Sequence, residues 1–212
     1  MRLKCIACDA LARPVYWCAA HSPHIVDVSL KRFGWHAVPH QLRQKLQSAI
    51  DKVEQDSRYD AVVLAYGLCG TATAGLRAGA LPLIIPRAHD CITLFLGGCE
   101  RYQKEFDACP GTYWYVQDYV ERGESEDTPL SIGAFTSSRA DAVYVEYVEK
   151  YGVDNATYLV DVMHEWQEHY ERAAFIDLGI GEPGTGAVFA RQEAEQHGWR
   201  FERLAGDLAL IK

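Results

Sequence analysis

The stretch DAVVLAYGLCG, residues 60–70, decides the fold class, because it is almost continuously apolar before it ends in a glycine-rich turn. A second such run, LPLIIPRAHDC, occupies residues 81–91. Strands that are apolar on both faces are typical of parallel sheets that helices cover on two sides. The segment 39–56 has apolar residues at helical spacing and begins with proline, so it predicts an amphipathic helix. Together these patterns predict an α/β fold with a mainly parallel sheet.

The rest of the chain continues this alternation. Short apolar runs predict strands over residues 3–7 and 25–30, and a helix of small residues is expected between the two long runs. Residues 92–108 predict a helix that Gly97 and Gly98 weaken. The remaining predictions are a strand over 111–120, helices over 138–151 and 155–172, a strand over 173–178 and a helix over 187–197. The C-terminal portion is therefore expected to be more helical.

Composition limits the domain organisation and the class of partner. With 212 residues, of which 49% are apolar and 24% charged, the chain is expected to form a single α/β domain over residues 1–212. The polar segment 121–133 is expected to be an acidic loop within it. A formal charge of -8 disfavours nucleic acid as the main partner. No apolar run approaches the roughly 18 residues of a membrane span, so we expect a cytoplasmic protein.

Three cysteines come directly after buried runs, namely Cys8, Cys69 and Cys91. Because ligands bind beyond the carboxyl ends of parallel strands, we expect these thiols to meet in one crevice. Such a trio suits a 4Fe–4S cluster with one open iron, or a zinc ion completed by His89 or water. A single free cysteine is more often a small core residue. That role is expected for the remaining four, Cys5, Cys18, Cys99 and Cys109.

Neighbouring side chains suggest how such a site could work. Arg87 could orient an anionic substrate, and Tyr66 could line the pocket. His89 could carry protons or serve as a fourth ligand. Without a metal, Cys91 could be a nucleophile whose base comes from elsewhere, with His36 as one candidate. The structural alternatives are an ion pair for Arg87, core packing for Tyr66 and helix-entry packing for His36.

A glycine-rich segment at residues 179–184 matches the pattern G-x-G-x-x-G of nucleotide-binding loops. Pro183 removes an amide from the phosphate cradle, and only about 28 residues remain for further β-α units. The pattern is therefore interpreted as a closing loop rather than a nucleotide site.

The segments IACDAL, YGLCG, PRAHDCITLFLG and PGTYW, with the ending WRFERLAGDLALI, resemble a bacterial and archaeal family known as domain of unknown function 1638. The resemblance implies that Cys8, Cys69 and Cys91 are the cysteines of the family motifs, and that His36 is its histidine before the first long helix. The family has no assigned reaction. Its members are frequent in anaerobes and methanogens, often near corrinoid-dependent methyl-transfer proteins, which implies one-carbon or corrinoid chemistry.

These observations predict a metal-dependent enzyme, of lyase or transferase type, whose three-cysteine site acts on a small anionic substrate in one-carbon, corrinoid or sulphur metabolism. Two alternatives stay open. The first is a non-catalytic accessory protein that binds a metal or corrinoid and has a methyltransferase as its partner. The second is a cysteine-nucleophile enzyme that uses no metal.

Overall fold

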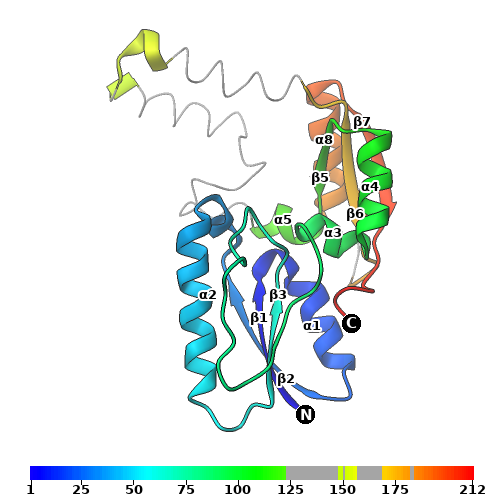
Figure 1. Cartoon of the computed structure of the whole chain (residues 1–212). Helices are drawn as coiled ribbons and strands as arrows, with labels where there is room; N and C mark the ends of the chain where they lie inside the picture. The colour runs from blue at the N-terminus through cyan, green and yellow to red at the C-terminus, as the bar shows by residue number, and fades with distance from the viewer. Residues whose placement is uncertain (123–147, 150, 157–168, 182–183) are drawn as a thin grey trace.

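A computed structural model of the chain describes residues 1–122, 148–149, 151–156, 169–181 and 184–212 (Figure 1). The predicted acidic loop, from residue 123 onward, lies outside the described residues. Nearly all of the helix predicted over 138–151 and most of the one predicted over 155–172 also lie outside them. Among the described residues, no helix combines the length and the apolar character needed to cross a bilayer.

The N-terminal half is built on a four-stranded parallel sheet of order β2-β1-β3-β4. Its strands are β1 (Arg2–Cys8), β2 (Ile25–Lys31), β3 (Ala61–Ala65) and β4 (Leu83–Ile84). The strands predicted over residues 3–7, 25–30 and within 60–70 are confirmed. The run at residues 81–91 contributes only the two residues of β4.

A second parallel sheet, of order β5-β6-β7, lies in the C-terminal half. Its strands are β5 (Thr112–Tyr115), β6 (Arg172–Asp177) and β7 (Arg200–Ala205). The α/β class and the parallel pairing are confirmed, but the strands form two sheets where the sequence predicted one. Apolar runs show that a strand is buried, and they carry no information on which strand lies beside it.

Helices cover both sheets. The 3₁₀ turn η1 (Asp9–Leu11) leads into α1 (Ala12–His21), and η2 (Phe33–Ala37) leads into α2 (Pro39–Glu54). The predicted helix at 39–56 is confirmed, and its buried face packs on the first sheet through Leu42, Leu46, Ile50 and Val53. The sequence pattern did not predict α1, in which Pro14 occupies the first turn, where proline is tolerated. The predicted helix at 187–197 is confirmed as α8 (Gly186–His197).

Glycine accounts for two differences between prediction and structure. The small-residue helix expected before β4 is wrong, since residues 69–75 form turns with positive φ at Gly70 and Gly75. The single helix expected over 92–108 is two helices, α3 (Cys91–Leu96) and α4 (Cys99–Ala108). Gly97 ends α3 in the left-handed region, with φ 79°.

The strand predicted over residues 111–120 is confirmed only as far as Tyr115, because α5 (Gln117–Arg122) follows it.

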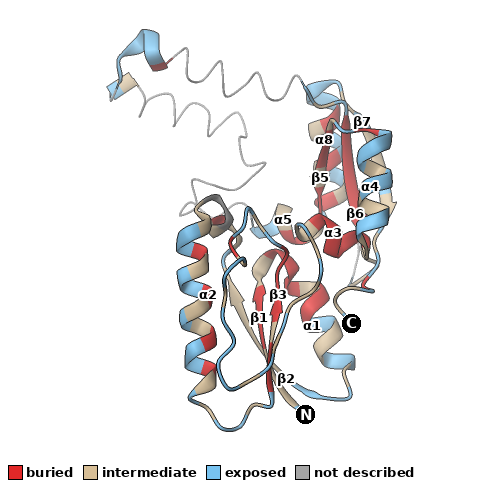
Figure 2. Ribbon diagram, in the orientation of Figure 1, coloured by how far each residue is buried: buried red, intermediate tan, exposed pale blue. Residues whose placement is uncertain are grey.

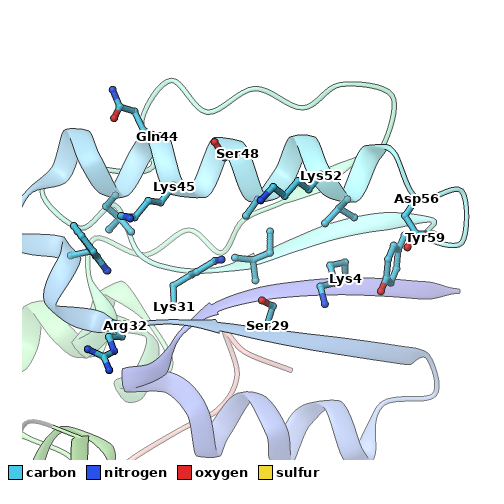
Figure 3. Close-up of a pocket in the computed structure, with 15 residues that line it drawn as sticks. Lys4, Ser29, Lys31, Arg32, Gln44, Lys45, Ser48, Lys52, Asp56 and Tyr59 are labelled. Atoms are coloured by element: carbon cyan, nitrogen blue, oxygen red, sulfur yellow. The ribbon is translucent and has the colours of Figure 1, made fainter. Parts of the chain in front are cut away.

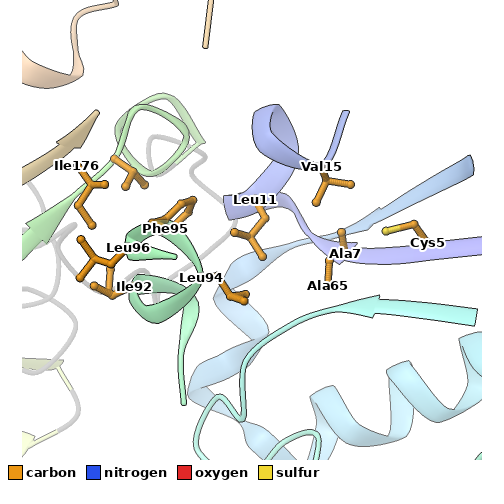
Figure 4. Close-up of a cluster of buried hydrophobic side chains, with 11 residues drawn as sticks. Cys5, Ala7, Leu11, Val15, Ala65, Ile92, Leu94, Phe95, Leu96 and Ile176 are labelled. Atoms are coloured by element: carbon orange, nitrogen blue, oxygen red, sulfur yellow. The ribbon is translucent and has the colours of Figure 1, made fainter. Parts of the chain in front are cut away.

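Helix α3 lies in the hydrophobic cluster that joins the two halves (Figures 2 and 4). Leu94, Phe95 and Leu96 are at most 1% exposed. The same cluster holds Leu11 from η1 and Ile176 from β6, so one core spans elements of both halves. Burial on every side of a six-residue helix fixes its position tightly, and with it the position of its first residue, Cys91.

Candidate functional site

The three cysteines singled out from the sequence come from three different elements. Cys8 is the last residue of β1, and Cys69 lies in the turn that follows β3. Because β1 and β3 are parallel neighbours, both reach the same edge of the sheet. Cys91 was expected at a strand end but is the first residue of α3, because β4 stops at Ile84.

Backbone hydrogen bonds tie the Cys69 turn to the segment that precedes α3. The Leu68 amide donates to the Ala88 carbonyl at 3.0 Å, and the Cys69 amide donates to the His89 carbonyl at 3.2 Å. A Cβ on Gly67 would lie 2.6 Å from the Asp90 Cα, so only glycine allows this approach. The group that approaches Gly67 is therefore the backbone of Asp90.

The turn itself contains strained backbone. Cys69 has φ 46° and Thr71 has φ 72°, in the left-handed region that residues other than glycine seldom adopt. Strain of this kind persists where the surrounding structure fixes it, and it is concentrated at functional sites. Here it turns the Cys69 position back toward the segment that leads into α3.

Cys91 is held by the first turn of α3. The Asp90 carboxylate caps the helix, accepting from the Thr93 amide at 2.8 Å and the Thr93 hydroxyl at 2.9 Å. The Cys91 thiol and the Tyr119 hydroxyl of α5 are 2.5 Å apart, within hydrogen-bond distance. Tyr119 was not predicted as a site residue, because it lies in a segment predicted to be a strand and has no local pattern that points to a thiol.

The three thiols influence one another electrostatically. Burial, followed by the charges of Cys91, Asp9 and Cys69, raises the pKa of Cys8 well above its usual range. Burial raises the pKa of Cys91 to about 12, with Cys69 contributing, and the pKa of Cys69 to about 11. The charged neighbours that act on them are Asp9 and Asp90, which raise these pKa values further. In the absence of a metal, all three thiols are therefore protonated at neutral pH.

Two tyrosine hydroxyls lie beside these thiols. Burial, followed by the thiols of Cys8 and Cys69, raises the pKa of Tyr66 far above its usual range. The Tyr66 side chain is only 2% exposed; its hydroxyl has the Cys8 thiol as a polar neighbour, and among the described residues it makes no hydrogen bond of ordinary geometry. A buried polar group without a partner is unusual, because it carries the full cost of desolvation. The Tyr66 hydroxyl is therefore available to a bound group.

The donor chemistry of the trio suits a thiophilic metal centre, because thiolates are the ligands of iron–sulphur clusters and structural zinc. Suitable donor atoms do not by themselves make a preformed metal site. Among the described residues, no group of three or more His, Cys, Asp or Glu side chains has the arrangement of a metal site.

Residues 31–212 match the protein family described as "Protein of unknown function (DUF1638)". The chain belongs to this family. The matched residues include Cys69 and Cys91, and Cys8 precedes them. No curated protein and no solved structure matches the chain.

In this DUF1638 protein, Arg87 and His89 lie apart from the thiols. Both line a surface groove together with Cys99 and Glu100. The His89 side chain is 73% exposed and lies 3.3 Å from the Asp90 carboxylate, measured from Nδ1 to Oδ2. Arg87 is exposed, whereas the ion-pair alternative assumed burial. The His89 carbonyl, rather than its ring, contacts the Cys69 turn.

The other sequence candidates of this DUF1638 protein have mixed outcomes. Cys5 and Cys109 are core residues, as predicted. Cys18 is half-buried, and the packing role predicted for Cys99 is wrong, since Cys99 begins α4 at an exposed position. The His36 side chain lies outside the described residues.

In the glycine-rich loop, Gly179 and Gly181 have positive φ. Pro183 of that loop lies outside the described residues.

Proposed function

We propose that Cys8, Cys69 and Cys91 hold a metal–thiolate centre, either an iron–sulphur cluster or a zinc ion, at which a small anionic substrate binds. What supports the proposal is that Cys8 and Cys69 follow the parallel neighbouring strands β1 and β3, and that Cys91 of α3 is coupled electrostatically to both. Core cysteines that merely fill space do not need to converge at one sheet edge. The proposed centre lies beyond the carboxyl ends of parallel strands, which is where α/β sheets usually bind ligands.

The electrostatics favour a metal over a metal-free nucleophile. A nucleophilic cysteine needs a lowered pKa, which a nearby histidine, lysine or arginine supplies. Here burial and acidic neighbours raise the pKa of Cys69 to about 11 and that of Cys91 to about 12. A bound metal cation reverses this effect, because it stabilises the thiolate directly.

The surrounding residues have definable roles in this proposal. A bound centre would supply a Lewis acid or an electron carrier, with one coordination position left to the substrate. The Tyr119 hydroxyl would orient the Cys91 sulphur from outside the ligand set. The Tyr66 hydroxyl would donate a hydrogen bond to the bound small molecule, which would satisfy an otherwise unpaired buried group.

The test is anaerobic purification followed by metal analysis and visible absorption spectroscopy. We expect brown protein with iron if a cluster binds, or colourless protein with zinc. Cys69→Ser and Cys91→Ser should each lose most of the metal, whereas the exposed Cys99→Ser should retain it.

Three other results would change the proposal. Protein without metal, even after anaerobic reconstitution with iron and sulphide or with zinc, would overturn it and favour a metal-free thiol. Equal metal content in the wild type and both site variants would overturn the assigned ligands. If metal binds but no small anion shifts the spectrum, the enzyme assignment fails in favour of an accessory protein that serves a methyltransferase or corrinoid partner.

A further inference from the structure

A groove separate from the thiols runs between α2 and the strands β1 and β2 (Figure 3). It exists because α2 packs over Ile6 of β1 and Val62 and Leu64 of β3, which leaves the edge strand β2 only partly covered. Its volume of about 650 Å³ is that of a small-molecule site.

Basic side chains dominate this groove. Five of the 21 lysine and arginine residues of the chain line it: Lys4, Lys31, Arg32, Lys45 and Lys52. Asp56 is its single acidic lining residue, and Arg58 already binds that carboxylate at 2.6 Å. A chain with a net charge of -8 therefore concentrates positive charge in one depression.

The cations come from both walls. On α2, Lys45, Ser48 and Lys52 follow helical spacing and lie on one flank. On the opposite wall Lys4 belongs to β1 and Lys31 to β2, and Figure 3 shows Lys31 extending toward α2. The Lys45 ammonium lies 4.0 Å from the centre of the Trp35 ring, which holds it at one end of the groove.

Three lysines of the groove have no ion-pair partner among the described residues. Within the described part of the chain, none of Lys31, Lys45 and Lys52 forms an ion pair. Like charges that share a groove repel one another, and the repulsion is relieved when an anion binds. The arrangement therefore has the chemistry of an anion site rather than of a structural ion-pair network.

We propose that this groove binds a small molecule with two or more linked phosphate groups, the chemistry of a nucleoside diphosphate or triphosphate. Several cations spread along one groove match a chain of phosphates better than a single carboxylate, and lysine binds phosphate as a point charge. The net charge of -8 opposes a long nucleic acid, whose remaining phosphates would be repelled. The volume of the groove likewise fits a nucleotide-sized ligand.

The groove shares no lining residue with the thiol site, but one of its ends lies near that site. Lys31 pairs with Cys8 in the β1–β2 register, so one end of the groove approaches the end of β1. The proposal does not rest on metal binding, and Cys69→Ser is expected to retain phosphate binding in full.

The test is isothermal titration calorimetry of the full chain with pyrophosphate and with ATP. We expect both to bind, and binding to weaken at least tenfold between about 50 mM and about 300 mM NaCl. The double variant Lys31→Gln/Lys45→Gln should lose roughly 100-fold in affinity, since each of the two charge-assisted contacts contributes about tenfold. Lys104→Gln, an exposed change on α4, is the matched control and should bind as the wild type does.

All the changed lysines lie at the surface or in the open groove, so the variants are expected to fold, and far-UV circular dichroism verifies this. If neither pyrophosphate nor ATP binds the wild type, the proposal is overturned. Equal affinity in the wild type and the double variant would overturn it as well, because the anion would then lie elsewhere.

Discussion

Asp90 sets the direction in which Cys91 enters α3, because its carboxylate accepts two hydrogen bonds from Thr93. Replacing it with alanine leaves the Thr93 amide without its cap. We expect Asp90→Ala to lower the free energy of unfolding by about 1 to 2 kcal/mol. Urea denaturation followed by circular dichroism measures this change. Asp90→Asn keeps an acceptor oxygen and should lose far less, so equal losses in the two variants would contradict the capping role.

The metal-free thiols make stability depend on alkaline pH. The pKa values of Cys69 and Cys91, about 11 and about 12 in the folded chain, lie above the value of 9.0 for a free thiol. Below pH 9 the thiols are protonated in both states, so their contribution is fully present. Above it the unfolded chain loses thiol protons first, and the free energy of unfolding falls by up to about 1.4 kcal/mol per thiol per pH unit.

Urea unfolding at about pH 8 and about pH 10, with chelator and reductant, measures this slope. The double variant Cys69→Ser/Cys91→Ser should lose part of it, which separates the thiols from other groups that titrate in the same range. Cys99→Ser is the matched substitution at an exposed position. An unchanged slope in the double variant would show that both thiols already ionise normally in the folded chain.

Cys8 and Cys69 could be placed at one sheet edge because the buried strands β1 and β3 are visible in the sequence, whereas Cys91 begins a helix that the strand pattern did not predict. What lies around these cysteines could not be predicted. Tyr119 reaches Cys91 only because α5 packs beside α3, a contact between residues 28 positions apart. Arg87 and His89 also follow an apolar run. Because β4 ends at Ile84, however, both residues lie beyond the strand, and their side chains are exposed.

At the scale of elements, Arg172 holds the C-terminal sheet together. It belongs to β6 and is 2% exposed. Its guanidinium donates to Thr112 of β5 at 2.8 Å, to Glu105 of α4 at 2.9 Å and to Glu202 of β7 at 3.0 Å. We expect Arg172→Met to lower the free energy of unfolding by about 3 kcal/mol, because it removes the guanidinium that the carboxylate and the carbonyl of Glu105 both bind.

Arg203→Met provides the comparison for Arg172. The Arg203 side chain is 59% exposed and pairs with Asp177, so its loss should be below about 1 kcal/mol. Urea denaturation of the two variants measures the difference in their free energies of unfolding, which follows from the midpoints if the dependence of that free energy on urea is unchanged. Losses of similar size would mean that solvent screens the Arg172 network despite its burial.

Helices whose apolar residues recur at a regular helical spacing were predicted with nearly correct bounds, as α2 illustrates. Elements decided by glycine or by neighbours were not. Gly97 and Gly98 were recognised as weakening one helix, but the break depends on a left-handed turn at Gly97 that sits against Asp207. The end of β5 depends on α5 packing on η1 and α8, which no local pattern encodes.

At the scale of the whole molecule, the two sheets are joined through one hydrophobic cluster. Phe95 and Leu96 of α3 lie in it with Leu11 and Val15 of the N-terminal half and Ile176 of the C-terminal half (Figure 4). The chain after β7 returns to the same helix, where the Asp207 amide donates to the Phe95 carbonyl at 2.9 Å. If the chain is a single domain, as the sequence predicts, this cluster must couple the unfolding of the two sheets.

Phe95→Ala tests that requirement. The side chain is fully buried, so its truncation should lower the free energy of unfolding by about 3 to 5 kcal/mol through lost transfer energy and the cavity left behind. In the wild type, circular dichroism and tryptophan fluorescence should report one coincident transition, because neither sheet can unfold without exposing the shared cluster. Phe106→Ala on α4, at a side chain 44% exposed, is the control and should change the midpoint little. Two separate transitions in the wild type would show that the halves are independent folding units, because the cluster would then couple them too weakly to count as one core.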